Sequence, residues 1–219
     1  MTSNEMIDLL ALRLEDPEHK TFTKDSKFKA LNVAQLTITN LITNELLTEL
    51  EHSEDITLDA NGTKAITSLT KEPIRNGIYA IYNQNTSVKA YINLINFKDI
   101  KRLENSYLKA DYTNPVGYIF ANKIHSQPKN ADTVTVYYLR KPTDIASGVD
   151  SELDVSLHEC VVDLAESQLW KMDSQYERAN QAQVNAMGTI DSLNMRLANE
   201  KPQGLGTYGR VSSTPPAGV

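Results

Sequence analysis

The stretch that decides the fold class is residues 153–170, Leu-Asp-Val-Ser-Leu-His-Glu-Cys-Val-Val-Asp-Leu-Ala-Glu-Ser-Gln-Leu-Trp. Its apolar side chains recur every three or four residues, which is the spacing of one face of an α-helix. The stripe continues to Met172 and consists of Leu153, Leu157, Cys160, Val161, Leu164, Gln168 and Met172. We therefore predict a helix from about residue 153 to residue 199, capped by Asp150 or Ser151, whose first half belongs to a core.

The second half of this helix has a weaker pattern. Residues 178–183 are polar, and apolar residues return only at Val184, Met187, Ile190, Leu193 and Leu197, with Gly188 as a possible break. A helix over the whole range would be about 70 Å long, whereas a compact chain of this size is about 45 Å across. We therefore expect the second half to project or to lean on other subunits.

The residues after this helix cannot form a core. Residues 202–219 are dominated by Gly, Pro, Ser and Thr, and the apolar side chains that could anchor them are Leu205, Tyr208, Val211 and Val219. Such a segment remains extended alone and orders on a partner. Fully extended, it could reach about 60 Å.

Two helices are predicted at the N-terminal end. The first runs from Ser3 to Leu14 and ends before Pro17, because proline disfavours helix in the residue that precedes it. Thr23 is the expected N-cap of a second amphipathic helix that reaches about Leu50. These helices and the helix after residue 150 are expected to pack as a bundle.

The middle of the chain changes to a period of two, which is typical of β-strands. Asn61-Gly62 is a type I′ hairpin signal between two short strands. Further strands are expected over 78–82, 88–95, 116–124 and 133–140, and a short helix is expected over 96–104. The prediction is a small β-rich subdomain.

These elements together predict an α+β protein that is mainly α. Residues 1–52 supply the N-terminal helices of a bundle, and residues 53–149 form the small inserted β-rich subdomain. Residues 150–199 form the long helix that completes the bundle, and residues 200–219 form an extended tail that binds a partner.

Charge and composition exclude several classes. The net charge is −6, divided as −4 over residues 1–52, +3 over 53–149 and −5 over 150–219. Specific nucleic-acid binding is therefore not expected, because it usually requires a net basic face. The sequence has no apolar run long enough for a membrane span, and its first residues lead us to expect no secretory signal. A single cysteine, Cys160, fits a reducing compartment. We expect synthesis in a cytoplasm.

No motif predicts catalysis, a metal or a cofactor. His158-Glu159-Cys160 begins like a zinc-protease helix, but position 162 is valine where a second histidine is needed. His158 and Cys160 point to different faces of a helix, and a cysteine on the apolar stripe acts as a small hydrophobe. Glu159, Asp163 and Glu166 share one helix strip, which we interpret as a solvated face rather than a glycosidase pair.

Two further groups of residues are open to more than one interpretation. The basic run Lys20, Lys24, Lys27 and Lys29 could face phosphate, but such a run is more often a solvated first turn. Tyrosines gather in the β-rich segment, at Tyr79, Tyr82, Tyr91, Tyr112, Tyr118, Tyr137 and Tyr138. Tyrosine suits half-buried sheet faces and interfaces equally well.

As a set, these elements resemble the head-to-tail adaptor proteins of tailed bacteriophages. The likeness lies in the order of elements over about residues 5–198: residues 21–25 open a longer helix that contains 31–35, a β-rich insertion contains Asn114-Pro115-Val116-Gly117-Tyr118, and residues 136–142 lead to the last core helix over 153–170. These segments are packing patterns and carry no chemistry.

The resemblance implies a structural virion protein at the neck, made in the host cytoplasm. It implies a homo-oligomeric ring, commonly dodecameric, which binds the portal protein on one side and tail or nozzle proteins on the other, and which lines a channel for DNA without binding it specifically. The tail would bind the portal or a neighbouring subunit through Leu205, Tyr208, Arg210, Val211 and Val219. The acidic net charge would keep the channel from gripping phosphates.

Three alternatives remain open at this point. A neck or tail-completion protein would have the same composition. A cell-wall hydrolase associated with the tail would need a carboxylate pair in a cleft, with Glu159 as the residue to test. A nucleic-acid-binding module would depend on Lys24 and Lys27.

Overall fold

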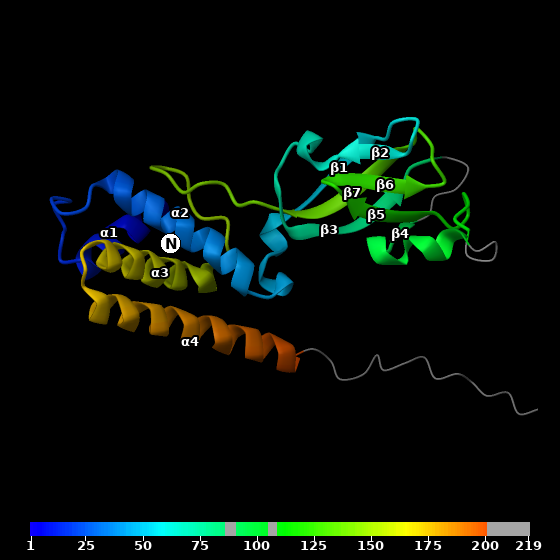
Figure 1. Cartoon of the computed structure of the whole chain (residues 1–219). Coiled ribbons are helices and arrows are strands. Elements are labelled where there is room, and N and C mark those ends of the chain that lie inside the picture. The colour runs from blue at the N-terminus through cyan, green and yellow to red at the C-terminus, as the bar shows by residue number, and fades with distance from the viewer. Residues whose placement is uncertain (86–90, 105–108, 201–219) are drawn as a thin grey trace, which may run out of the picture.

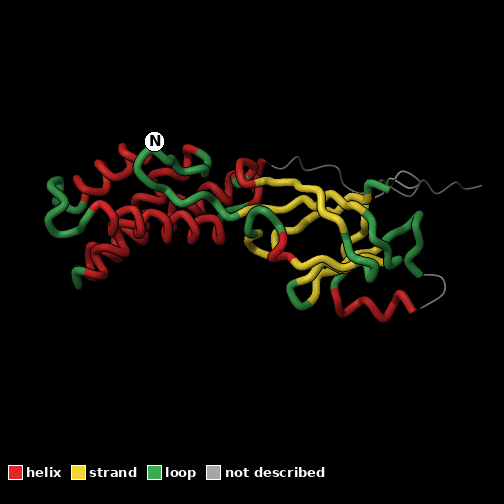
Figure 2. The backbone as a smooth tube through the Cα atoms, turned by 90° about the horizontal axis from the view of Figure 1, so that it is seen from above, coloured by secondary structure: helices red, strands yellow, loops and turns green. Residues whose placement is uncertain are grey.

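The computed structural model describes residues 1–85, 91–104 and 109–200. The molecule is elongated, with a helical body at one end and a β body at the other (Figures 1 and 2). The β body is contiguous in sequence, from residue 51 to residue 140, so the chain passes between the two bodies twice. None of the helices in the described ranges is long and apolar enough to cross a membrane.

Four α-helices form the helical body: α1 (Ser3–Arg13), α2 (Lys24–Leu41), α3 (His158–Met172) and α4 (Tyr176–Glu200). The N-caps Thr2 and Thr23 accept hydrogen bonds from the backbone N–H groups of Glu5 and Ser26, which satisfies donors that the first helical turn leaves free. The first helix and the Thr23 cap are therefore confirmed. The second helix ends at Leu41 rather than near Leu50, and two 3₁₀ turns follow, η1 (Asn44–Leu46) and η2 (Thr48–Leu50).

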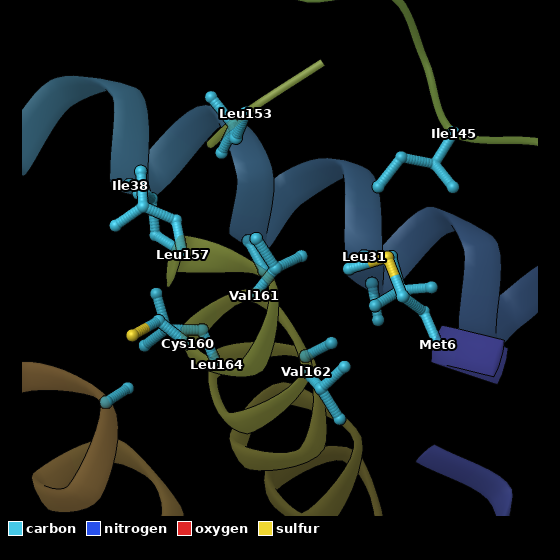
Figure 3. Close-up of a cluster of buried hydrophobic side chains, with 14 of the residues drawn as sticks. Met6, Leu31, Ile38, Ile145, Leu153, Leu157, Cys160, Val161, Val162 and Leu164 are labelled. Carbon is cyan, nitrogen blue, oxygen red and sulfur yellow. The ribbon is translucent and has the colours of Figure 1, made fainter. Parts of the chain in front are cut away.

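The core of the helical body lies between α1, α2, α3 and α4 (Figure 3). Leu31 and Ile38 of α2 face Leu157 and Val161 from the other end of the sequence, and all four side chains are fully buried. The predicted stripe is confirmed at Leu153, Leu157, Cys160, Val161 and Leu164, which are buried. It is wrong at Met172, which is 72% exposed because α3 ends there.

The β body contains seven described strands in the order β1-β7-β3-β4-β5-β6-β2. Their bounds are β1 Glu51–Thr57, β2 Thr63–Ala65, β3 Pro73–Asn83, β4 Tyr91–Leu94, β5 Val116–Phe120, β6 Lys123–Gln127 and β7 Thr133–Arg140. The pairs are antiparallel except β4 with β5, so the sheet is mixed. Short 3₁₀ helices, η3 (Ile66–Ser68) and η4 (Phe97–Glu104), connect strands.

The prediction of a mainly α protein with a small β-rich subdomain is wrong. The sheet is a large, curled, mixed body with a core of its own, formed by Ile56, Leu58, Leu69, Ile78, Ile81, Ile92, Ile124, Val134, Val136 and Tyr138. The sequence marks each short strand separately, whereas the pairing of β7 with both β1 and β3 joins them into one sheet. Pairings between strands so far apart in sequence leave no local pattern.

The predicted hairpin at Asn61-Gly62 is also wrong. Gly62 has a positive φ of 69°, but β1 pairs with β7 and β2 pairs with β6, so the two flanking strands are not partners. Instead, the Asp59 carboxylate accepts hydrogen bonds from the N–H groups of Asn61 and Thr63 and closes a local turn. The tight hairpin lies at Ala121-Asn122, where both φ angles are positive, and divides the strand predicted over 116–124 into β5 and β6.

The long helix predicted over 150–199 is two helices. Asp154 caps a 3₁₀ turn, η5 (Val155–Leu157), whereas Asp150 accepts the backbone N–H of Ser3. The break between α3 and α4 lies at residues 173–175 and not at Gly188, and α4 folds back along α3 (Figure 1). The expectation that the second half projects is therefore wrong, and its alternative, that this half leans on other subunits, stays a prediction.

Polar side chains hold the junction between the two bodies. Arg140, the last residue of β7, pairs with Glu152 at 2.7 Å, and the same carboxylate accepts the N–H of Thr143. Arg75 of β3 donates to the carbonyl oxygen of Ile42 at 2.6 Å. These bonds fix the segments that leave and enter the β body.

Candidate partner interface

One concavity of the helical body is an open groove of about 640 Å³ between the end of α1, one face of α3 and the first half of α4. It is lined by Arg13, Glu15, Ser156, Glu159, Cys160, Asp163, Glu166, Trp170, Arg178, Gln181, Ala182, Asn185 and Thr189. The lining combines carboxylates with two arginines, so the groove is polar and suits a macromolecular contact better than a small apolar ligand.

Arg13 of α1 lines the groove together with the carboxylates of α3. Its guanidinium pairs with Asp163, with Glu159 at 3.1 Å and with Glu166 at 3.6 Å. The strip of carboxylates predicted to be solvated therefore binds an arginine from another helix, and Asp163 is buried. The sequence reasoning missed Arg13 because the partners are about 150 residues apart.

Burial alters the chemistry of two groups along this face of α3. Burial raises the pKa of Asp163, and its bond to Arg13 opposes that shift. Burial also raises the pKa of the Cys160 thiol to about 11, and nearby Asp163 and Glu159 add to the shift. A thiol with so high a pKa is a poor nucleophile at neutral pH, which agrees with the packing role predicted for Cys160.

The outer side of α4 exposes apolar side chains. Val184 is 65% exposed and Met195 is 67% exposed. A hollow of about 670 Å³ lies beside Gly188 and is lined by Asn180, Gln183, Val184, Met187 and Asp191. Val184 lines this hollow, so an exposed apolar side chain is available there for contact with another protein.

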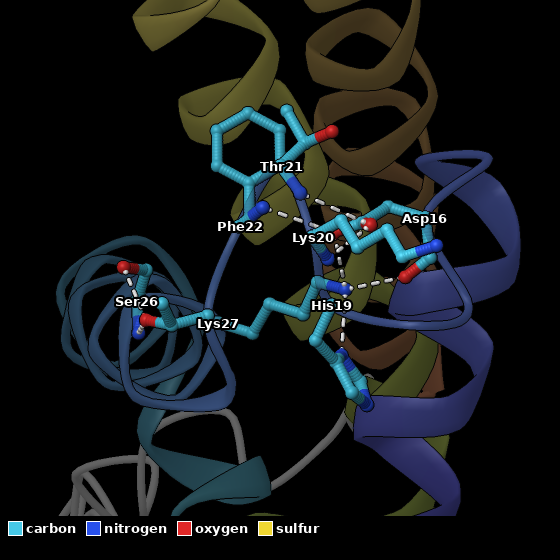
Figure 4. Close-up of polar contacts among 8 residues, drawn as sticks. Asp16, His19, Lys20, Thr21, Phe22, Ser26 and Lys27 are labelled. Atoms are coloured by element: carbon cyan, nitrogen blue, oxygen red, sulfur yellow. Dashed lines mark hydrogen bonds and ion pairs between the residues drawn. The ribbon is translucent and has the colours of Figure 1, made fainter.

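A second polar cluster joins α1 to α2 and was not foreseen (Figure 4). Lys27 is fully buried, and its ammonium donates to the carbonyl oxygen of Asp16 at 2.9 Å and to the Asp16 carboxylate at 3.1 Å. The Lys27 ammonium also lies 2.9 Å from Nδ1 of His19. Because an ammonium can only donate, that ring nitrogen accepts and His19 is neutral.

The pKa values agree with this geometry. Burial would raise the pKa of Asp16, but hydrogen bonds from the backbone N–H groups of Phe22 and Thr21, from Lys27 and from the N–H of Lys20 hold it well below its usual range. Burial lowers the pKa of His19, and the charges of Lys27 and Lys24 lower it further against smaller opposite effects of Asp16 and Asp8. The solvated interpretation of the basic run is therefore wrong at Lys27, although Lys20, Lys24 and Lys29 are exposed.

His158 is buried in the helical body. Its Nε2 lies 2.9 Å from the carbonyl oxygen of Leu153, and its Nδ1 lies 2.8 Å from the N-terminal ammonium of Met1. The described residues contain no group of three or more His, Cys, Asp or Glu side chains that could hold a metal ion. Both ring nitrogens of His158 thus have structural partners.

The tyrosines of the β body divide between the two roles that the sequence left open. Tyr138 and Tyr118 are buried, whereas Tyr79, Tyr91 and Tyr112 are at least half exposed. Four rings form a separate cluster: Phe97 stacks on Phe120 with 4.0 Å between centroids, and Tyr118 stacks on His125 at 4.6 Å.

The residues predicted to bind a partner from the tail, Leu205, Tyr208, Arg210, Val211 and Val219, lie outside the described residues. No protein-family model matches the sequence, and no curated protein matches it. Function must therefore be argued from the residues and from their arrangement.

Proposed function

We propose that the protein is a structural subunit of a bacteriophage virion, a head-to-tail adaptor whose ring joins the portal of the capsid to the tail and surrounds the DNA channel. The observation that carries the proposal is the elongated subunit with two separate cores, one in the helical body and one in the β body (Figure 2). Such a subunit offers a different surface at each end, as a connector between two unlike neighbours requires.

Charge supports the same function. The net charge of −6 disfavours a tight grip on DNA, since every neutralised phosphate would add salt-dependent affinity. The resemblance in the order of elements, from the N-terminal helices through the β body to the helix of residues 153–170, supports an adaptor more than a general structural protein. A neck or tail-completion protein is the nearest alternative.

A hydrolase is less well supported than a connector. A glycosidase needs one carboxylic acid and one carboxylate that are both free to reach the substrate. Here one guanidinium, that of Arg13, pairs with Glu159, Asp163 and Glu166. These ion pairs connect α1 to α3, which is a structural role.

The decisive experiment is the mass of the purified protein alone and after mixing with the portal protein of the same virus, by light scattering or native mass spectrometry. We expect the chain to join the portal as a ring of many copies. A protein that ignores the portal, with or without tail proteins, would overturn the proposal. Loss of cell-wall lysis on Glu159→Gln would instead support the hydrolase.

The tail has a test of its own. Deletion of residues 202–219 should weaken portal binding and leave the fold intact, because the deleted residues lie beyond α4. The far-UV circular dichroism of the shortened chain is the control for the fold. Unchanged portal binding would remove the tail from the proposed interface.

A further inference from the structure

Charge is divided unevenly along the length of the molecule. The helical body, residues 1–50 and 141–200, contains 9 Lys and Arg and 19 Asp and Glu, a net charge of −10. The part of the β body from residue 61 to residue 130 contains 10 Lys and Arg and 4 Asp and Glu, a net charge of +6. The two bodies lie at opposite ends of an elongated molecule (Figures 1 and 2), so the subunit has an acidic end and a basic end.

The basic end combines lysines with exposed aromatic rings on one face of the sheet. Lys123 of β6 is the register partner of Phe120 of β5, so the two side chains lie on the same face. The helix η4 packs on this face, because its Phe97 stacks on Phe120 with 4.0 Å between the ring centroids. Both phenylalanines remain more than 40% exposed, and Lys98 and Lys101 of η4 are exposed beside them in the sequence.

The same helix borders a hollow of about 370 Å³, which is lined by Ile100, Leu103, Lys109, Ala110, Gln127, Pro128 and Lys129. We call the five exposed lysines of η4, β6 and this hollow the lysine surface; they are Lys98, Lys101, Lys109, Lys123 and Lys129. None of these five forms an ion pair with a residue in the described ranges. Unpaired cations around half-exposed aromatic rings suit a contact with an acidic protein surface.

The groove of the helical body has the complementary charge. Its lining holds four carboxylates against two guanidinium groups. The side chains of Glu15 and Glu159 are 73% and 70% exposed, so these two carboxylates can reach a partner. Leu12 and Val155, which precede the groove residues Arg13 and Ser156 in the sequence, are exposed apolar side chains. The acidic surface thus also combines charge with apolar area.

We infer that the lysine surface of one copy of this chain docks on the groove of the helical body of a second copy. One chain cannot make this contact with itself, because the two surfaces belong to bodies at opposite ends of the molecule. Charge favours a second copy over nucleic acid as the partner. A second copy presents a body with a net charge of −10, whereas a nucleic acid would be repelled by the net charge of −6 of the whole chain.

The contact joins two unlike surfaces, and each copy carries one of each. Contacts of this kind add copies head to tail and close into a ring when the rotation between subunits permits it. The closure into a ring rests on the proposed function, whereas the contact between the two surfaces does not. The experiment below is therefore done on this chain alone, without the portal.

Three pairs of charge reversals test the contact. Lys98→Glu with Lys123→Glu reverses the lysine surface, and Glu15→Lys with Glu159→Lys reverses the groove. Lys24→Glu with Lys29→Glu is the matched control, because it makes the same change in net charge at exposed lysines of α2. Thermal unfolding checks the fold of each variant; little change is expected, since the ion pairs of Glu15 and Glu159 are exposed.

The measured quantity is the dissociation constant of self-association, from light scattering over a concentration series. Reversal of either surface should raise it at least about tenfold, because like charges then meet. The control should change it less than about threefold at 0.1 M salt, where charges more than about 10 Å apart are screened. A chain with both surfaces reversed should return to within about threefold of the wild type, because opposite charges face each other again.

Three results would overturn the inference: a wild-type chain that stays monomeric, an equal effect of the control pair, or no recovery when both surfaces are reversed. Single-stranded DNA that binds the wild type and not the lysine-surface variant, with self-association unchanged, would overturn it in favour of nucleic acid. Self-association that stops at two copies and is lost on either reversal would support the docking and contradict the ring. Portal binding by a chain that stays monomeric alone would keep the adaptor function without this contact.

Discussion

The ammonium of Lys27 lies 3.1 Å from the carboxylate of Asp16, and both side chains are buried between α1 and α2. The Asp16 carboxylate also accepts the backbone N–H groups of Lys20, Thr21 and Phe22. A single carboxylate thus organises the connection between the first two helices, and one lysine neutralises it.

Lys27→Met should destabilise the helical body by about 3 kcal/mol, because it leaves the Asp16 carboxylate buried without its cation. The exposed Lys29 on the same helix is the matched control, and Lys29→Met should change the free energy of unfolding by less than about 0.5 kcal/mol. The measurement is urea unfolding followed by the fluorescence of Trp170, the single tryptophan, which lies in α3. Equal stabilities of the two variants would show that the ion pair contributes nothing.

His19 should make the protein less stable as the pH falls below about 6.5. The pKa of His19 is lowered in the folded protein, so the unfolded chain binds the proton first and acidification favours unfolding. His19→Asn should remove this dependence just below about pH 6.5, since asparagine tolerates the φ of 53° at this position. Urea unfolding at several pH values provides the measurement.

The wild-type protein and the His19→Asn variant should both still lose stability below about pH 4. The pKa of Asp16 is lowered in the folded protein, so the unfolded chain binds this proton first and acidification favours unfolding. If the His19→Asn variant kept the wild-type pH dependence of stability, a group other than His19 would be responsible for it.

Leu164→Ala should cost about 2 to 5 kcal/mol, because this α3 side chain is 7% exposed and part of the helical core. Leu12→Ala on α1 removes the same atoms from a side chain that is 70% exposed, and should cost well under about 1 kcal/mol. Thermal unfolding of the two variants side by side measures the difference. A similar cost for both would mean that Leu12 is buried in an assembly.

Gly77→Ala should destabilise the β body by about 3 kcal/mol, since a Cβ there would lie 2.3 Å from the carbonyl oxygen of Ile74, a backbone atom. Gly188→Ala is the opposite case, because a Cβ in the middle of α4 would meet nothing within 4 Å. It should stabilise the isolated chain by about 1 kcal/mol. If Gly188→Ala also weakens ring formation, the hollow beside it is a contact between subunits.

Arg13→Gln should cost about 2 kcal/mol, chiefly because Asp163 is then buried without a partner. Adding Asp163→Asn should restore part of the loss, as the uncompensated charge is removed. Glu159→Gln alone should have little effect on stability, because this carboxylate is exposed. No recovery in the double variant would show that Arg13 acts through its other contacts.

The local elements were predictable where the signal was local. The Thr23 cap, the strand over 133–140 and the buried positions Leu153, Leu157 and Val161 agree with the structure. The errors arose where a local sequence signal was overridden by pairing between strands that are distant in the sequence. Asn61-Gly62 has the residues of a type I′ turn, yet Ala121-Asn122 forms the tight hairpin because β5 and β6 are neighbours in the sheet.

The candidate interface was predictable only in part. The strip of Glu159, Asp163 and Glu166 was visible from its spacing, but the binding of Arg13 was not, because its charge comes from the other end of the sequence. Lys27 appeared to be one lysine among four in an exposed run. The sequence around Lys27 does not distinguish it from the other three lysines. Its partner, Asp16, is brought near only by the packing of two helices.

The sequence by itself determined the helical periodicity, the caps and the positions of most strands, because these depend on residues a few positions apart. It also determined the net charge of −6. Only the tertiary structure decided the extent of the sheet, the burial of Lys27 and the reversal of α4 onto α3. These three features depend on contacts between segments that are distant in the sequence. Such contacts stabilise the fold only after the entropy of closing the loop between the segments has been lost.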